Sequence, residues 1–133
     1  MERSLVDTNV ILRYLLQDDA TLFEKASAIL EKVKTGQEKV IILESVLTEC
    51  VYVLLKVYKI NRTAIAKSLR TLLHYKGIAN PDKLDLIDSM DIFSQTNLSF
   101  VDCILCAKSR NNGMPLHTFD EDLARAARSQ TAE

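Results

Sequence analysis

Short apolar runs with strand character alternate with longer stretches of helical periodicity, and this alternation restricts the folds open to the chain. The strand-like runs occupy residues 4–6, 39–43 and 114–117. Strands separated by helical segments pair in parallel, because a helical crossover returns the chain to the same end of the sheet. We therefore predict an α/β fold in which a small parallel sheet is covered by helices on both faces.

The helical segments are bounded by residues that commonly begin or end helices. Gly36 and Gly77 each follow a helical segment, and Asn80 with Pro81 predicts an N-cap and a first helical position. Ser99 is expected to cap the next helix. The expected helices cover residues 10–16, 22–33, 46–58 and 61–75, followed by three that begin near residues 81, 99 and 120.

The chain of 133 residues suits one domain with one core, spanning residues 1–133, and its formal net charge is −1. A strongly basic chain would indicate nucleic-acid binding directly, so here any polyanion would need a local basic patch. The longest uninterrupted apolar run, residues 50–55, is far shorter than the roughly 18 residues of a membrane span. The N-terminus also lacks the pattern of a signal peptide. We expect a cytoplasmic protein with no membrane segment.

The three cysteines and two histidines offer little for redox or soft-metal chemistry. Cys103 and Cys106 have CxxC spacing, which can indicate such chemistry. No second cysteine pair accompanies them, and His74 and His117 lack the spacing of metal ligands. We interpret the cysteines as reduced thiols in the core, the CxxC pair being two small residues near one helix face.

Four acidic residues, Asp7, Glu49, Asp102 and Asp120, stand beside or within apolar segments. Asp7 and Asp120 each follow a strand-like run, at the edge of a parallel sheet where sites gather. Glu49 interrupts the apolar helical run VLTECVYVLL, where an unpaired carboxylate is costly. Asp102 lies at the start of another helical run. Converging carboxylates indicate a hard divalent cation such as Mg²⁺ or Mn²⁺, which can activate water against a phosphodiester.

Three of these acids also have a purely structural interpretation. Asp7 and Asp120 could each cap the helix that follows, and Asp102 stands three residues after Ser99, as in a capping box. Glu49 is harder to explain in this way, because its own helix contains no arginine and Lys56 is the nearest local cation. A metal cluster formed with distant carboxylates explains Glu49 better.

The segments around these acids resemble the four acidic motifs of PIN-domain ribonucleases and, more narrowly, of the VapC toxins of bacterial and archaeal toxin–antitoxin pairs. They are SLVDTNVILRYLL, LESVLTECVYVLLKVY, LSFVDCILCAKS and PLHTFDEDLAR, in this order. The resemblance covers nearly the whole chain and implies a PIN-like three-layer α/β/α fold with a small central parallel sheet of four strands. VapC-like chains commonly add a fifth strand after the last helix, where this chain has only LARAARSQTAE, so a fifth strand is left open.

The resemblance implies that Asp7, Glu49, Asp102 and Asp120 are the catalytic and metal-binding acids of an endoribonuclease that holds one or two Mg²⁺ or Mn²⁺ ions. Asn9, Ser99, Thr118 and, more loosely, Asp122 match supporting positions. Proteins of this family cleave RNA and usually form homodimers, and the toxins are neutralised by a cognate antitoxin protein. A tRNA or another structured RNA is a candidate substrate, because sequence-specific readers of RNA usually target single-stranded or loop regions.

Local positive charge near the motifs provides candidates for contacts with RNA phosphates. These candidates are Arg13, Lys108, Arg110, Arg125 and Arg128, and each could equally belong to a solvated polar face.

Three other functions are weighed against the toxin. A PIN-fold RNA-processing nuclease without a toxin role would carry the same acids, and a neighbouring antitoxin gene would distinguish the two. A non-catalytic module that binds RNA or protein is disfavoured because all four acids are present. A Mg²⁺-dependent phosphatase of the haloacid dehalogenase type would need a second aspartate where this chain has Asn9.

Overall fold

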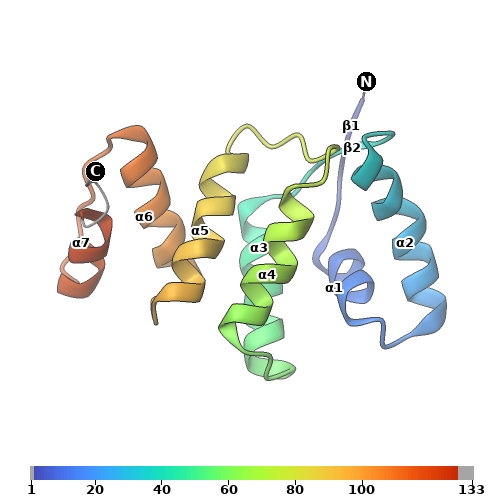
Figure 1. The fold of residues 1–133 in the computed structure, drawn as a ribbon, viewed down its shortest axis with the longest axis horizontal. Coiled ribbons are helices and arrows are strands. Elements are labelled where there is room, and N and C mark those ends of the chain that lie inside the picture. Colours follow the sequence, from blue (N-terminus) through green and yellow to red (C-terminus); the bar gives the residue numbers. More distant parts are fainter. Residues whose placement is uncertain (1, 129–133) are drawn as a thin grey trace.

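The computed structural model describes residues 2–128, and most of them are helical (Figure 1). The two strands are β1 (Arg3–Leu5) and β2 (Lys39–Ile41). The helices are α1 (Thr8–Leu16), α2 (Ala20–Thr35), α3 (Glu44–Tyr52), α4 (Arg62–Leu73), α5 (Lys83–Gln95), α6 (Phe100–Asn112) and α7 (Glu121–Arg128), and the π-helical stretch η1 (Val53–Val57) extends α3. The predicted helices are therefore all present. Within residues 2–128, no helix combines the length and apolar character that crossing a membrane requires.

The sheet is smaller than the sequence predicts. β1 and β2 pair in parallel, with Ser4 opposite Val40, and a single parallel bridge joins Val40 to Ile78. The described residues thus form two strands, where four or five were expected. The α/β class and the parallel pairing are confirmed, but the strand count is not.

Residues 114–117 do not form the predicted last strand, because their backbone turns back onto the end of α6. The Met114 amide donates to the Ser109 carbonyl (3.2 Å), and the Ser109 hydroxyl donates to the Met114 carbonyl (2.6 Å). Pro115 follows and has no amide hydrogen to offer a neighbouring strand. Met114 and Phe119 consequently remain exposed.

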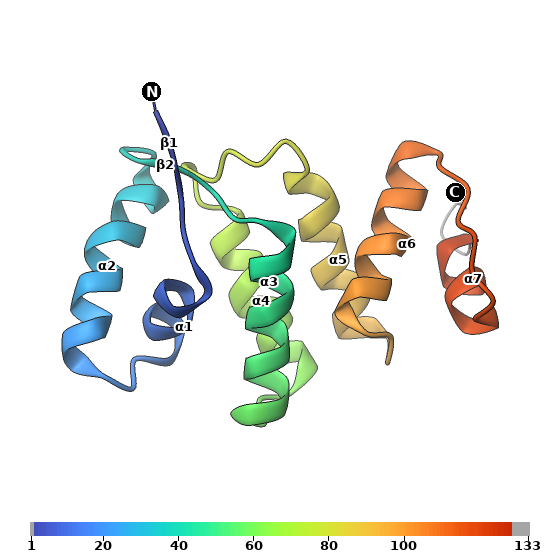
Figure 2. The ribbon, with the colours of Figure 1, turned by 180° about the vertical axis from the view of Figure 1, so that it is seen from behind.

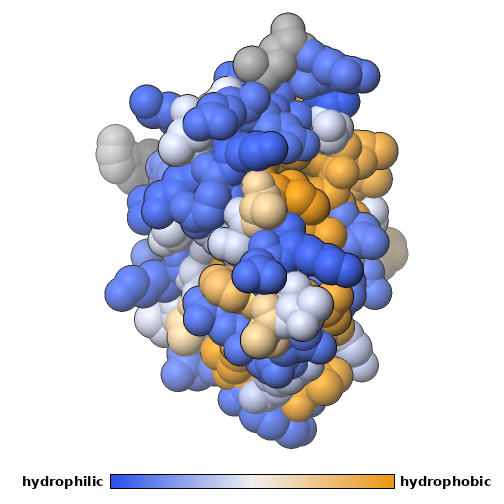
Figure 3. Space-filling model, turned by 90° about the vertical axis from the view of Figure 1, so that its right-hand side faces the viewer, coloured by the Kyte–Doolittle hydropathy of each residue, from blue (hydrophilic) through white to orange (hydrophobic). Residues whose placement is uncertain are grey.

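The helices follow one another along the longest axis of the molecule (Figures 1 and 2). The sheet lies with α1 and α2 toward one end, α3 and α4 occupy the middle, and α7 lies at the opposite end. The packed pairs include α1 with α2, α1 with α3, α4 with α5, α5 with α6 and α6 with α7. This arrangement differs from the expected three layers around a central sheet. The face at the α2 end is largely polar, with apolar side chains gathered along one side (Figure 3).

One hydrophobic core joins these elements, from Val6 after β1 to Leu123 on α7. Helical spacing brings Leu86, Met90 and Phe93 of α5 to the same buried face. The Phe93 ring meets a second buried aromatic ring, that of Phe100, edge to face at 5.9 Å between centroids. Burial of these large apolar side chains provides most of the free energy that stabilises the packing of the helices against one another.

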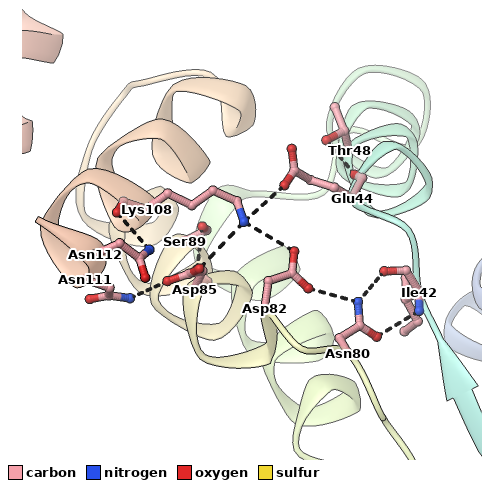
Figure 4. A network of polar contacts seen from close by, with 10 residues as sticks. All are labelled: Ile42, Glu44, Thr48, Asn80, Asp82, Asp85, Ser89, Lys108, Asn111 and Asn112. Atoms are coloured by element: carbon pink, nitrogen blue, oxygen red, sulfur yellow. Dashed lines mark hydrogen bonds and ion pairs between the residues drawn. The ribbon is translucent and has the colours of Figure 1, made fainter. Parts of the chain in front are cut away.

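Asn80 has a role that the sequence does not predict. Asp82, rather than Asn80, is the N-cap residue of α5. The Asn80 side chain instead bonds both backbone groups of Ile42, accepting from its amide (2.9 Å) and donating to its carbonyl (2.7 Å), as Figure 4 shows. Because Asn80 is only 8% exposed, it satisfies buried backbone groups just beyond β2, where a further strand would otherwise be needed.

Replacing Asn80 by alanine is expected to lower the free energy of unfolding by about 3 kcal/mol, because two buried backbone groups of Ile42 lose their partner. Chemical denaturation of the variant measures this change. Asn111→Ala is the matched control, since within residues 2–128 the exposed Asn111 amide bonds only the side chains of Asp85 and Asp88 on α5 and no backbone group. An equal decrease in the free energy of unfolding of the two variants would show that the Asn80 contacts with Ile42 do not stabilise the fold more than a surface contact does.

Lys108 on α6 joins three elements through carboxylates (Figure 4). Its Nζ lies 3.4 Å from Asp82, 3.6 Å from Asp85 and 3.7 Å from Glu44. Partial burial opposes the charge of Lys108, but the three carboxylates outweigh this effect and raise the pKa of the ammonium group. Lys108 therefore ties α6 to the beginnings of α5 and α3.

Candidate active site

Asp7 and Glu49 are linked through Thr8, although they are 42 positions apart in the sequence. Asp7 is the N-cap of α1, where its Oδ1 accepts from the Val10 amide (3.1 Å). Thr8, the next residue, donates its hydroxyl to Glu49 Oε1 on α3 (2.7 Å). The packing of α1 against α3 thus forms the first acidic pair. Thr8 is the residue that the sequence reasoning missed, although it stands within the Asp-Thr-Asn motif.

The charges of this first pair converge on one buried thiol. The pKa of Cys50, ordinarily 9.0, is raised to about 12, first by burial and then by the negative charges of Glu49 and Asp7. Glu49 itself is exposed, so the prediction that its apolar helical run makes an unpaired carboxylate costly is wrong. The apolar residues around it on α3, including Leu47 and Val51, turn inward and leave Glu49 in water.

Asp102 and Asp120 line a second acidic pocket, of about 450 Å³, between the start of α6 and the start of α7. Asp122, Ser99 and Asn97 also line it. The Asp102 amide donates to the Ser99 hydroxyl oxygen (3.2 Å), which caps α6 as predicted. The pocket therefore offers carboxylate, hydroxyl and amide oxygens on one open surface.

Asp7 and Asp120 both cap the helices that follow them, as the structural interpretation predicted. Asp120 Oδ1 accepts from the Leu123 amide (3.1 Å) at the start of α7, while its own amide donates to the Thr118 hydroxyl (3.0 Å). Each cap is made through one carboxylate oxygen, and a carboxylate has two oxygens with further lone pairs. Capping holds these side chains at helix ends and leaves them able to bind a cation.

The acids are brought together as pairs rather than as a single quartet. Among residues 2–128, no three of the histidine, cysteine, aspartate and glutamate side chains are close enough to hold one metal ion. The chemistry of the donors nevertheless fits a hard cation, because Mg²⁺ prefers oxygen and usually keeps several waters beside one or two carboxylates. A pair such as Asp102 and Asp120 in an open pocket meets that description.

The basic candidates for RNA contacts also take part in the structure of the fold. Arg13 forms an ion pair with Asp18 (2.8 Å), and Lys108 faces the three carboxylates already described. Arg110 donates to the Ala126 carbonyl (3.1 Å from Nε) and so fastens α7 to α6. Arg125 pairs with Asp122 (2.8 Å), both side chains being exposed. Arg128 is exposed at the end of α7.

The structure also places Asn9 and the three cysteines. Asn9 is exposed beside Asp7, where both line a small pocket of about 240 Å³.

The cysteines are free and buried, as predicted, and burial raises the pKa of Cys103 to about 12. A thiol that stays protonated at neutral pH is a poor nucleophile and a poor metal ligand. The CxxC spacing is therefore a feature of core packing.

Comparisons with known proteins show which family and which relative the chain is similar to. A family model described as PIN domain matches residues 4–129, a span that includes all four acids. The chain is also similar to a "VapC ribonuclease" of Aquifex aeolicus (strain VF5), with 26% identity over 110 residues that cover 83% of this chain and 81% of that protein. No solved structure gives a significant match.

Proposed function

The chain belongs to the PIN-domain family, and from this premise we propose that it is a metal-dependent endoribonuclease acting as a VapC-type toxin. One observation supports this function above the others. The four acids lie as two pairs on α1 with α3 and on α6 with α7, and α3 also packs against α6. The pairs thus stand on adjoining parts of the fold.

Asp102 and Asp120 are the residues proposed to hold a divalent ion, Mg²⁺ or Mn²⁺, in their shared pocket. Such an ion lowers the pKa of a bound water and stabilises negative charge on a phosphate. The Thr8 hydroxyl orients Glu49 through Oε1, so that Oε2 is the atom proposed to accept a proton from the attacking water. Asp7, beside Glu49, adds a second carboxylate for one or two ions.

The proposed partners follow from the family and from the similar Aquifex protein, a VapC ribonuclease. We propose an RNA substrate, with tRNA or another structured RNA as the candidate, a cognate antitoxin protein and a homodimeric assembly. Apolar side chains such as Leu5, Val57 and Phe119 are exposed on the described surface, and contact with a protein partner would cover surface of this kind.

Removal of divalent metal is expected to stop RNA cleavage. Purified protein incubated with total cellular RNA should cut it in Mg²⁺ or Mn²⁺, leave it intact in EDTA, and cut it again when excess metal is restored. Gel analysis of the products measures the effect. Equal cleavage in EDTA would contradict metal dependence. Absence of cleavage by folded protein free of antitoxin under all conditions would favour a binding module.

A further inference from the structure

Another pocket, of about 420 Å³ and called the α3–α6 pocket below, adjoins the acidic pocket of Asp102 and Asp120. Its lining includes Thr48 and Tyr52 of α3, Lys56 of η1, Phe93 of α5, and Asn97 and Ser99 before α6. Asn97 and Ser99 line both pockets, so the two form neighbouring parts of one depression. A molecule bound in the acidic pocket of Asp102 and Asp120 could therefore extend into the α3–α6 pocket.

This pocket lies between the two elements that carry the central acids. Thr48 directly precedes Glu49 on α3, and Ser99 and Val101 belong to the N-cap and first turn of α6, which also carries Asp102. Asp102 and Asp120 line the adjoining acidic pocket, which shares Asn97 and Ser99 with this one. A substrate that continued across Asn97 and Ser99 would therefore reach these two carboxylates.

The walls of the pocket combine an exposed aromatic ring with a buried apolar floor. The Tyr52 residue is 61% exposed, although it belongs to a helix whose other large apolar side chains turn inward. Phe93 and Phe100, packed edge to face at 5.9 Å, provide the floor. Exposed aromatic rings of this kind are the surfaces on which unpaired nucleic-acid bases stack.

The two cations of the pocket have different roles. Arg62 lies over the Phe93 ring, 3.7 Å from its centroid, and donates to the carbonyls of Phe93 and Leu98. These contacts hold Arg62 in the wall of the pocket. Lys56 is exposed at the rim, where an ammonium group can approach the phosphate attached to a bound base.

We propose that this pocket binds one unpaired RNA base next to the bond that is cut, with Tyr52 stacking on the base and Lys56 contacting its phosphate. The inference rests on the proposed ribonuclease function and names the substrate feature that the enzyme selects, a single-stranded or flipped-out nucleotide. The pocket is also lined by polar side chains, those of Thr48, Asn97 and Ser99, which can form hydrogen bonds with the edge of a base. An apolar peptide bound in the same pocket would leave these groups without a partner.

The test measures binding separately from cleavage. Fluorescence anisotropy of a short labelled single-stranded RNA, in buffer with EDTA, gives the Kd for the full chain and its variants. Tyr52→Ala should raise the Kd about tenfold, within the range of base stacking on one aromatic ring, whereas Tyr52→Phe should retain the affinity of the unaltered protein. Lys56→Ala should reduce the steepness of the salt dependence by about 0.7, the loss of one phosphate contact.

Leu84→Ala, which removes an exposed apolar side chain at the start of α5, is the matched control and should leave the Kd unchanged. Intact binding by Tyr52→Ala would overturn the base pocket while leaving the nuclease proposal in place. Duplex RNA bound as tightly as single-stranded RNA would also overturn it. If the unaltered protein bound no RNA and cut none in Mg²⁺ or Mn²⁺, the ribonuclease proposal itself would fall.

Discussion

Asp7→Asn is expected to lower the rate of RNA cleavage by more than about 100-fold while the protein stays folded. Loss of residues that only support a metal ligand already reduces activity by about 10–100-fold, and Asp7 is proposed to contribute its own carboxylate. Asparagine keeps the cap of α1, because asparagine and aspartate are comparably good N-cap residues and only one oxygen accepts from Val10. Cleavage rates with Mg²⁺ and melting temperatures of both proteins measure the two effects.

Asp19→Asn is the matched control for this substitution. Asp19 is the N-cap of α2 and accepts from the Leu22 amide (3.0 Å), the same contact that Asp7 makes at α1. The control therefore makes the same chemical change at the same kind of position, away from Glu49. Equal cleavage by the Asp7 and Asp19 variants would remove Asp7 from the site, since capping alone would then explain its presence.

Gly77→Ala is expected to lower the free energy of unfolding by about 3 kcal/mol or more. A Cβ atom at Gly77 would lie 2.1 Å from the Glu38 carbonyl oxygen and 2.7 Å from that of Val33, and both contacts are with backbone. The Gly77 amide also donates to the Val33 carbonyl (2.7 Å), and its carbonyl accepts from Val40 (2.8 Å). Relief of the overlap must therefore shift the segment around residue 77 away from the end of α2 and from Glu38.

Gly113→Ala distinguishes this steric effect from a loss of backbone freedom. Gly113 ends α6 at a φ of 61°, and a Cβ atom there would meet nothing within 4 Å. The strain of an alanine in this left-handed conformation costs about 1 kcal/mol. Chemical denaturation should therefore rank Gly77→Ala well below Gly113→Ala in stability. An equal decrease in the free energy of unfolding of the two variants would mean that the backbone around Gly77 rearranges to accommodate a Cβ atom at little cost.

Local features of the sequence were sufficient to predict the helices and most of their ends. The caps at Asp7, Ser99 and Asp120 were predicted, because an N-cap bonds amides two or three residues away. Gly36 ends α2 with a φ of 86°, as expected for a glycine at that position. Membership of the PIN-domain family could also be predicted, because the order of the acidic motifs is itself a property of the sequence.

The tertiary structure alone decided which distant groups meet. The bond of Thr8 to Glu49 joins residues 41 positions apart, and that of Asn80 to Ile42 joins residues 38 apart. No local pattern specifies either contact, since each depends on how whole helices pack. The same packing left Glu49 in water, turned Lys108 toward three carboxylates and kept residues 114–117 out of the sheet. Strand pairing depends on a partner supplied from elsewhere in the fold, whereas helix formation satisfies its hydrogen bonds within one segment.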